Sequence, residues 1–259
     1  MKKKIIEEVN RLFSEEHIKG FVALRRQGDH IAPHVFTHPE DLDDLSLGDR
    51  DKPGDSRYPL AGLLCRMATM YPNDRFAVLV RGCDERAVHQ LMVGSRITPL
   101  HPGRIILVGF SCPPELAQAC QCHKPWPDAL IAGEPVPGVE PEEEVLSDTV
   151  EELENWFDIF DRCVKCFGCR NICPVCDCRE CTMEREPMVP QRELPASPNF
   201  LLTRAVHMVD RCVYCGLCEQ VCPADIPLKS LYRFVARVMG QGLEFPGVRS
   251  MPPQSLTAA

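Results

Sequence analysis

The sequence contains no apolar run approaching the roughly 18 residues of a membrane-spanning helix, so no membrane span is expected. It lacks G-x-G-x-x-G after a strand and G-x4-G-K-[ST], the glycine-rich motifs of nicotinamide and nucleotide sites. No Ser/His/Asp or paired-carboxylate arrangement stands out either. With a formal net charge of -8, the protein is not expected to bind nucleic acid, because phosphate binding needs a basic surface. The N-terminal lysines precede no continuous apolar segment of a signal peptide, and we expect a soluble, cytoplasmic chain.

Cysteine, in contrast, is abundant. The chain has 16 cysteines among 259 residues, far above ordinary usage. Most of them stand two or three residues apart, too close to pair efficiently with one another as disulfides. This grouping favours metal ligation in a reducing compartment.

The first part of the chain, residues 1–132, is predicted to form an α/β domain. Short apolar runs at 76–80 and 105–110 have the length and β-branched content of buried strands. Helical spacing of apolar residues precedes and separates them, and the residues that show it are Leu60, Leu63, Leu64, Met67, Val88, Leu91 and Met92. Alternation of this kind predicts parallel strands with helices between them.

Two other segments of this domain have clear patterns. Residues 1–20 are predicted to be an amphipathic helix, with Ile5, Val9, Leu12 and Phe13 on one face, followed by an apolar stretch. Residues 41–57 are rich in Asp, Gly and Pro, and we expect them to form a surface loop.

An acidic, proline-rich segment over residues 133–147 is predicted to be a linker, because its composition cannot build a core. Thr149 and Glu152 then form a capping-box pattern at the start of a helix. The apolar stripe expected to pack this helix consists of Val150, Leu153, Phe157 and Phe160. Residues 148–259 are predicted to form the second domain.

Two copies of the motif C-x2-C-x2-C-x3-C-P dominate that second domain. Their cysteines are Cys163, Cys166, Cys169 and Cys173, and then Cys212, Cys215, Cys218 and Cys222. This motif is typical of two-cluster ferredoxins, in which the fourth cysteine of each run ligates the other cluster. We therefore predict one 4Fe-4S cluster bound by Cys163, Cys166, Cys169 and Cys222, and a second bound by Cys212, Cys215, Cys218 and Cys173. Structural zinc is the alternative, but zinc sites usually present separated C-x2-C pairs.

Four more cysteines fall in the first domain. Cys83 and Cys112 each follow a predicted strand, where open α/β sheets place their sites, and Cys120 and Cys122 come soon after. A third 4Fe-4S cluster bound by these four is predicted. The alternative is that they are ordinary buried cysteines.

The remaining cysteines are harder to place. Cys176, Cys178 and Cys181 follow the first motif and could supply three ligands of a fourth cluster, completed from elsewhere in the chain. Cys65 lies on an apolar helix stripe and is predicted to pack in the core. His123, beside Cys122, is a further candidate ligand.

Residues 174–211 separate the two motifs and include a helical stripe, and a second stripe follows Cys222. The two stripes consist of Leu201, Leu202, Ala205, Val206 and Val209, and of Leu228, Leu231, Tyr232, Val235 and Val238. This arrangement resembles the α-helical dicluster ferredoxin module of respiratory and heterodisulfide-reductase-type subunits. The expected fold class is therefore an α/β N-terminal domain followed by a mainly helical dicluster ferredoxin domain.

The segments RCVKCFGCRNICPVCDCRECTME, from Arg162, and RCVYCGLCEQVCPADIPL, from Arg211, resemble the beta subunit of deazaflavin-linked formate dehydrogenases. The segments around Cys83, Cys112 and Cys120 resemble the cofactor domain of that family, and residues 245–253 resemble its tail. In that family a long segment that helps to form the flavin and deazaflavin sites precedes the counterpart of the linker. Here only residues 113–132 stand in its place.

This resemblance implies an iron-sulfur electron-transfer subunit, rather than a catalytic one, in a multi-subunit oxidoreductase complex. The implied partners are flavoprotein or molybdenum/tungsten dehydrogenase subunits, and heterodisulfide-reductase-like or electron-bifurcating subunits. The first alternative is a reductase subunit with its own flavin in the N-terminal domain. The second is a zinc-stabilised interaction protein.

Overall fold

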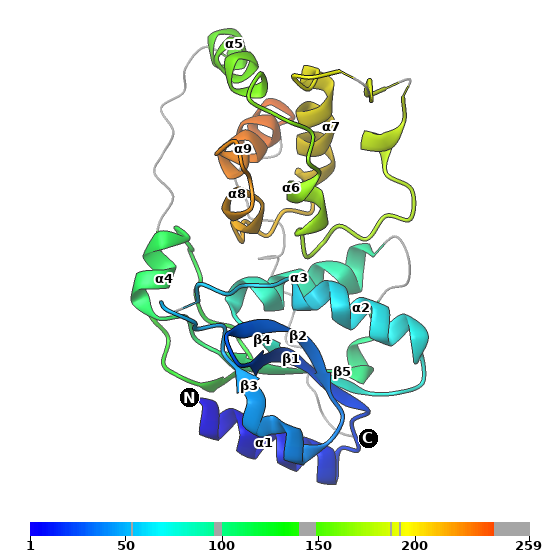
Figure 1. Ribbon diagram of the computed structural model, residues 1–259, viewed down its shortest axis with the longest axis vertical. Coiled ribbons are helices and arrows are strands. Elements are labelled where there is room, and N and C mark those ends of the chain that lie inside the picture. Colours follow the sequence, from blue (N-terminus) through cyan, green and yellow to red (C-terminus); the bar gives the residue numbers. More distant parts are fainter. Residues whose placement is uncertain (53, 96–99, 140–148, 187, 192, 241–259) are drawn as a thin grey trace.

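The computed structural model describes residues 1–52, 54–95, 100–139, 149–186, 188–191 and 193–240. Its lower part contains a sheet and the helices that cover the sheet, and its upper part contains the helices of the two ferredoxin motifs (Figure 1). Among the described residues, no helix is long and apolar enough to cross a membrane. The segment at 245–253 lies outside the described residues.

The sheet has six strands in the order β2-β1-β4-β5-β6, and β3 pairs with β1. The strands are β1 (Gly20–Gln27), β2 (His30–Phe36), β3 (Leu45–Ser46), β4 (Phe76–Val80), β5 (Ile105–Phe110) and β6 (Leu130–Ala132). β1, β4, β5 and β6 run parallel, whereas β2 and β3 are antiparallel to β1. The predicted strands at 76–80 and 105–110 are confirmed, and so is their parallel pairing.

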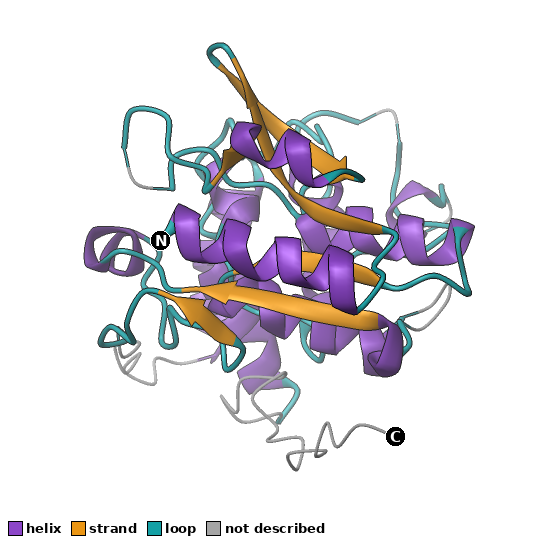
Figure 2. Ribbon diagram, turned by 90° about the horizontal axis from the view of Figure 1, so that it is seen from below, coloured by secondary structure: helices purple, strands orange, loops and turns teal. Residues whose placement is uncertain are grey.

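Helices cover both faces of the sheet. The helices of this part are α1 (Lys2–Glu15), α2 (Leu60–Met70), α3 (Gly82–Gly94) and α4 (Pro114–Ala119), with short 3-10 turns η1 (Pro39–Asp44) and η2 (Pro102–Arg104). Figure 2 shows α1 lying across the sheet face that points away from the upper part. α2 and α3 pack against β1, β4 and β5 on the other face, between the sheet and the upper part (Figure 1).

Two sequence predictions in this part are wrong in detail. The first helix ends at Glu15 and not at residue 20, because His17 adopts a left-handed conformation and β1 begins at Gly20. Residues 41–57 are not simply a surface loop. They contain the end of η1 and strand β3, and Leu42 and Leu45 are buried in the core. The prediction relied on the many Asp, Gly and Pro residues of this segment and overlooked these two buried leucines.

The upper part consists of α5 (Thr149–Phe160), α6 (Gly168–Asn171), α7 (Pro198–Met208), α8 (Leu217–Gln220) and α9 (Leu228–Val238), with the 3-10 turn η3 (Thr182–Glu184). α7 packs against α9, and α6 against α8. The helical stripes predicted on either side of the second motif therefore pack largely against each other. Two of their members, Val206 and Val238, are exceptions, since their side chains are 47% and 54% exposed.

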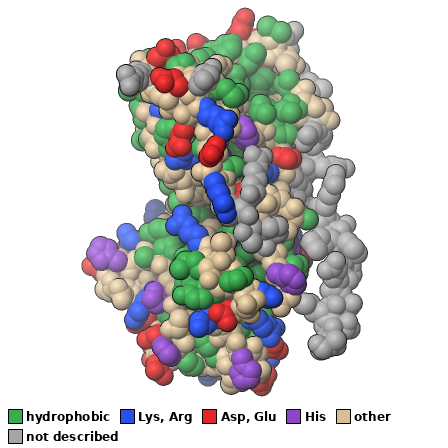
Figure 3. Space-filling view, turned by 90° about the vertical axis from the view of Figure 1, so that its right-hand side faces the viewer, with side chains coloured by type: hydrophobic (Ala, Val, Ile, Leu, Met, Phe, Trp, Pro, Cys, Tyr) green, Lys and Arg blue, Asp and Glu red, His purple; other side chains and the backbone are tan. Residues whose placement is uncertain are grey.

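The predicted buried face of α5 is also partly wrong. Trp156 and Phe160 are buried, and Trp156 lies 6.2 Å from Phe160 and 6.3 Å from Phe234 between ring centroids. Val150 and Phe157 are 65% and 39% exposed instead of packed. The buried face is thus rotated toward Trp156, and hydrophobic side chains remain visible on the surface of the upper part (Figure 3).

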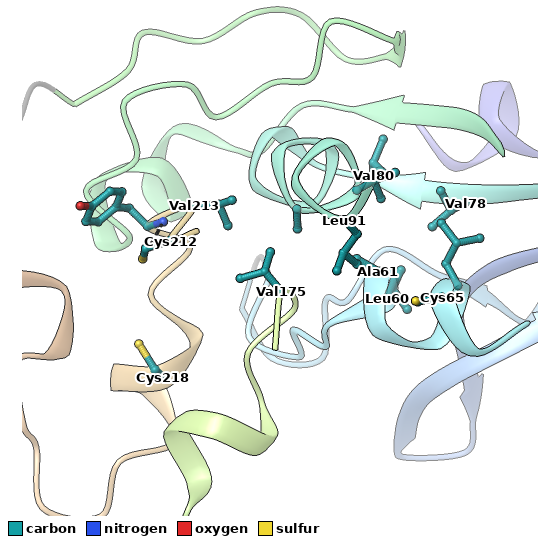
Figure 4. Close-up of a cluster of buried hydrophobic side chains, with 14 of the residues drawn as sticks. Leu60, Ala61, Cys65, Val78, Val80, Leu91, Val175, Cys212, Val213 and Cys218 are labelled. Carbon is teal, nitrogen blue, oxygen red and sulfur yellow. Dashed lines mark hydrogen bonds between the residues drawn. The ribbon is translucent and has the colours of Figure 1, made fainter. Parts of the chain in front are cut away.

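The two parts share one continuous hydrophobic core. In the close-up of Figure 4, Val175 and Val213 of the cysteine-rich segments lie on the side that faces Leu91 of α3 and Ala61 of α2. Cys65 packs in the same core with an exposure of 6%, as predicted. This contact holds the ferredoxin motifs against the helices that follow the strands.

Candidate metal centres

All 16 cysteines lie in the described residues, and none of them forms a disulfide. Four of them line one cavity of about 340 Å³, including space open to solvent. These four, here called site 1, are Cys163, Cys166, Cys169 and Cys222. The first three come from the end of α5 to α6, and Cys222 arrives from the end of the second motif, after α8.

A second cavity, of about 320 Å³, is lined by Cys173, Cys212, Cys215 and Cys218, here called site 2. Its fourth cysteine belongs to the first motif. The two short helices α6 and α8 lie against each other, which brings the end of each motif beside the start of the other. The structure thus places together both sets of four cysteines that were predicted to share a cluster.

The local backbone of the two motifs repeats. Lys165 and Phe167 flank Cys166 with φ of 50° and 58°, and Tyr214 and Gly216 flank Cys215 with φ of 50° and 76°. These left-handed residues bend the chain around the central cysteine. Backbone N–H groups consequently point at sulfur: Gly168 donates to Cys166 Sγ at 3.4 Å, and Tyr214 to Cys212 Sγ at 3.4 Å. Such bonds favour the thiolate and tune a bound cluster.

We expect Gly216→Ala to lower the free energy of unfolding by about 1 kcal/mol, because only glycine adopts a left-handed conformation without cost. The added methyl group itself would meet no atom closer than 3.8 Å, so backbone strain is the cause. Denaturant unfolding under anaerobic conditions measures the change. Gly62→Ala in α2, where the methyl group also meets nothing within 4 Å, is the control. It is expected to stabilise by about 1 kcal/mol, since glycine weakens helices. A neutral effect of Gly216→Ala would contradict the strain argument.

The four cysteines of the first domain, here called site 3, are Cys83, Cys112, Cys120 and Cys122. Cys83 lies in the first turn of α3, just after β4, and Cys112 follows β5. β4 and β5 are parallel neighbours, so their carboxyl ends meet at one edge of the sheet. α4 and the turn after it return Cys120 and Cys122 to that edge, where the Cys122 N–H donates to Ala117 O at 3.0 Å.

Electrostatic neighbours connect the members of site 3. Cys83 and Cys112 each interact with Cys122, and Cys112 also interacts with Cys83. Arg57 joins Cys120 to this set, because its guanidinium lies 3.0 Å from Cys120 Sγ and 4.0 Å from Cys83 Sγ. The described end of the predicted linker also packs here, since the Val139 N–H donates to Cys122 O at 2.9 Å.

Arg57 connects site 3 with the upper part of the molecule. Its guanidinium also donates to the backbone oxygen of Cys215, a member of site 2, at 2.6 Å. Lys229 makes a second connection, because its Nζ lies 3.2 Å from Cys120 O. Sequence reasoning missed both residues. Arg57 lies in the segment taken for a surface loop, and no local pattern marks a cation that closes on distant sulfur atoms.

Burial raises the pKa of many of these thiols. The pKa of Cys83 rises to about 11, through burial and then through the neighbouring Asp84, and that of Cys112 rises to about 12, through burial and then through the neighbouring Cys83. In site 1, burial raises the pKa of Cys169 to about 11, although the positive charge of the neighbouring Arg204 acts to lower it. These thiols therefore carry protons at neutral pH without a metal, and metal binding must release the protons. His123 is different, since burial lowers its pKa to about 4 and leaves it neutral.

The remaining three cysteines, Cys176, Cys178 and Cys181, line another cavity beside α7. Within the described ranges, no three His, Cys, Asp or Glu side chains form a group that could hold a single metal ion. A zinc site needs sulfur atoms about 2.3 Å from one shared ion. A cubane binds each sulfur at a different iron corner, which spreads the ligands around a larger space. Sites 1 and 2 each present four cysteines around one cavity, which is the number of ligands that a cubane needs.

Comparisons with known proteins agree with this geometry. Residues 159–226 match a family of 4Fe-4S dicluster domains. The chain is 36% identical over 111 residues to the F420-dependent formate dehydrogenase subunit beta of Methanocaldococcus jannaschii. It is 39% identical over 113 residues to the F420-dependent formate dehydrogenase 1 subunit beta of Methanococcus maripaludis.

These alignments cover 42% and 43% of this chain, and 29% of the length of each relative. The resemblance to formate dehydrogenase beta subunits is confirmed over that share. The chain therefore carries a 4Fe-4S dicluster domain over residues 159–226.

Proposed function

We propose that this chain is an electron-transfer subunit of an oxidoreductase complex, with 4Fe-4S clusters held by the thiolates of sites 1, 2 and 3. When bound, such clusters accept and donate single electrons, over potentials of roughly -700 to +450 mV. In this proposal residues 1–132 form the α/β domain, 133–147 the linker, and 148–259 a dicluster domain of the α-helical ferredoxin type.

One observation carries the proposal: the three sites adjoin one another. Sites 1 and 2 exchange their fourth cysteines, and Arg57 contacts sulfur atoms of site 3 together with the backbone of Cys215 in site 2. Relay of electrons requires such closeness, whereas structural metal sites do not. The protein's own part is to hold the thiolates, to donate backbone N–H bonds to sulfur and to supply buried cations.

Buried side chains around sites 1 and 2 also influence the electrostatics of a bound cluster. Arg204 is only 3% exposed, and its guanidinium donates to the backbone oxygen of Cys169 at 3.2 Å. Tyr232 is 1% exposed and lines the cavity of site 2, with no hydrogen-bond partner for its hydroxyl among the described residues. A buried cation and an available O–H donor both stabilise the reduced, more negative state of a bound cluster.

Partners follow from the relatives. Their names describe beta subunits of formate dehydrogenases, so we propose a dehydrogenase subunit as the electron donor or acceptor. A flavoprotein, a molybdenum/tungsten dehydrogenase, or a heterodisulfide-reductase-like or electron-bifurcating subunit fits this role. The short segment between Cys112 and the linker favours a relay without a substrate site of its own.

The test is to purify the full chain without oxygen and to measure iron, sulfide, zinc and flavin per chain. Two clusters give about eight irons and three give about twelve, with signals that appear on reduction. Cys65→Ala, which alters a core cysteine outside the three sites, is expected to leave the iron content unchanged. Fewer than about eight irons without a reducible signal, or zinc in their place, would contradict the proposal. Bound flavin with turnover by the isolated chain would favour the reductase alternative.

A further inference from the structure

Sites 1, 2 and 3 leave three clustered cysteines without a role. Cys176, Cys178 and Cys181 line one side of a cavity of about 430 Å³, including space open to solvent. This is somewhat larger than the cavities of sites 1 and 2, at about 340 and 320 Å³. The lining also includes Arg204 and His207 of helix α7, and Arg211, which follows that helix.

The loop that carries these cysteines is fixed against α7. Asp177, between the first two cysteines, accepts a hydrogen bond from Arg211 at 2.8 Å, and both side chains are 7% exposed. Arg204 places its guanidinium 3.6 Å from Cys176 Sγ. A buried ion pair needs partners in good geometry, so this one fixes the loop to the turn that follows α7. The second cation faces the sulfur and offsets the negative charge that thiolate ligands would bring.

His207 is the residue of α7 that can complete a set of four ligands. Its Nδ1 lies 2.7 Å from the backbone oxygen of Thr203. A carbonyl oxygen only accepts hydrogen bonds, so Nδ1 carries the proton and Nε2 carries the lone pair. Ligating histidines are oriented in this way, with one ring nitrogen donating to a carbonyl and the other bound to the metal.

We propose that Cys176, Cys178, Cys181 and His207 form a fourth site that binds a 4Fe-4S cluster, with His207 Nε2 as the only non-cysteine ligand. The donor set suits an iron-sulfur cluster, because three thiols and an imidazole line one cavity whose volume is comparable with those of sites 1 and 2. The Cys176 N–H donates to Cys173 O at 3.3 Å, so the fourth site adjoins site 2. It therefore extends the proposed relay toward the surface beside α7.

The test uses the full chain, purified and reconstituted with iron and sulfide without oxygen. The variant Cys176→Ala/Cys178→Ala/Cys181→Ala is expected to bind about four fewer irons than the wild type. In protein labelled with ¹⁵N-histidine, pulsed electron paramagnetic resonance of the reduced wild type is expected to show coupling to one imidazole nitrogen. His207→Cys should retain the iron and lose this coupling. His101→Ala, at an exposed histidine, should retain both.

The outcomes separate this site from the proposed function. Equal iron in the wild type and the triple variant overturns the fourth site alone, and so does one zinc ion per chain bound there. Absence of nitrogen coupling in the iron-replete wild type rejects His207 as a ligand, and this measurement does not depend on any variant folding. Wild-type protein without any iron would instead contradict the relay as a whole.

Discussion

Cys173→Ala is expected to remove the cluster of site 2 and to spare that of site 1, although Cys173 belongs to the first motif. The reason is geometric, since Cys173 lines the site 2 cavity with Cys212, Cys215 and Cys218. Loss of one of four thiolates leaves an iron corner without its ligand, and the iron content should fall by about four per chain. Iron and sulfide analysis, with spectra of the reduced protein, measures the loss.

Double variants make this prediction sharp. Cys173→Ala combined with Cys212→Ala should lose no more iron than either single variant, because both residues serve site 2. Cys173→Ala combined with Cys163→Ala should lose about eight irons, since two clusters are then affected. The reciprocal change, Cys222→Ala, should spare site 2. The opposite pattern, with Cys173 and Cys163 acting as one unit, would show that each motif binds its own cluster.

Arg57→Gln is expected to lower the midpoint potential of the site 3 cluster by on the order of 100 mV. A hydrogen bond from a charged donor contributes about 1.5–3 kcal/mol, and about 1.4 kcal/mol corresponds to 59 mV for one electron. Burial works against the Arg57 cation, but the sulfurs of Cys83, Cys120 and Cys215 together raise its pKa, so it stays charged. Removing the cation therefore destabilises the more negative, reduced cluster. Titration against potential, followed by electron paramagnetic resonance, measures the shift.

Two further variants control for this effect. Arg57→Lys keeps a positive charge near the sulfurs and should shift the potential much less. Arg50→Gln removes an exposed arginine of the same segment and should leave all potentials unchanged. Unaltered site 3 potentials in Arg57→Gln would mean that the guanidinium does not face a cluster, which would remove the proposed connection between sites 2 and 3.

The strands were predictable where their apolar residues form a continuous run. β4 and β5 have continuous apolar runs that match their observed bounds, because a strand covered on both faces needs apolar residues throughout. β2 was missed because it is an edge strand with an exposed Pro33 and only two buried residues. β3 was missed because it is two residues long and its pairing with β1 depends on distant contacts.

Helix α5 shows a second limit. Its apolar residues lie on more than one face of the helix, and their spacing alone predicted that the face with Val150 and Phe157 is buried. The observed face uses Trp156 instead, since its ring lies beside Phe234 of α9. Which of two apolar faces a helix buries is decided by the partner that packs on it, and that partner is distant in the sequence.

The sequence by itself determined the chemistry, because close spacing of cysteines on a tight turn brings three thiolates together whatever surrounds them. It also showed that the fourth ligand must come from elsewhere in the chain. For sites 1 and 2, the presence of two motifs predicted which cysteine supplies that ligand. Only the tertiary structure decided what surrounds the sulfurs. Three such residues, Arg57, Arg204 and His207, lie near cysteines in space but far from them in the sequence. Their roles therefore depend on how α7 and the rest of the upper part pack. Local spacing can specify a ligand, whereas the charges and hydrogen bonds around it come from long-range contacts.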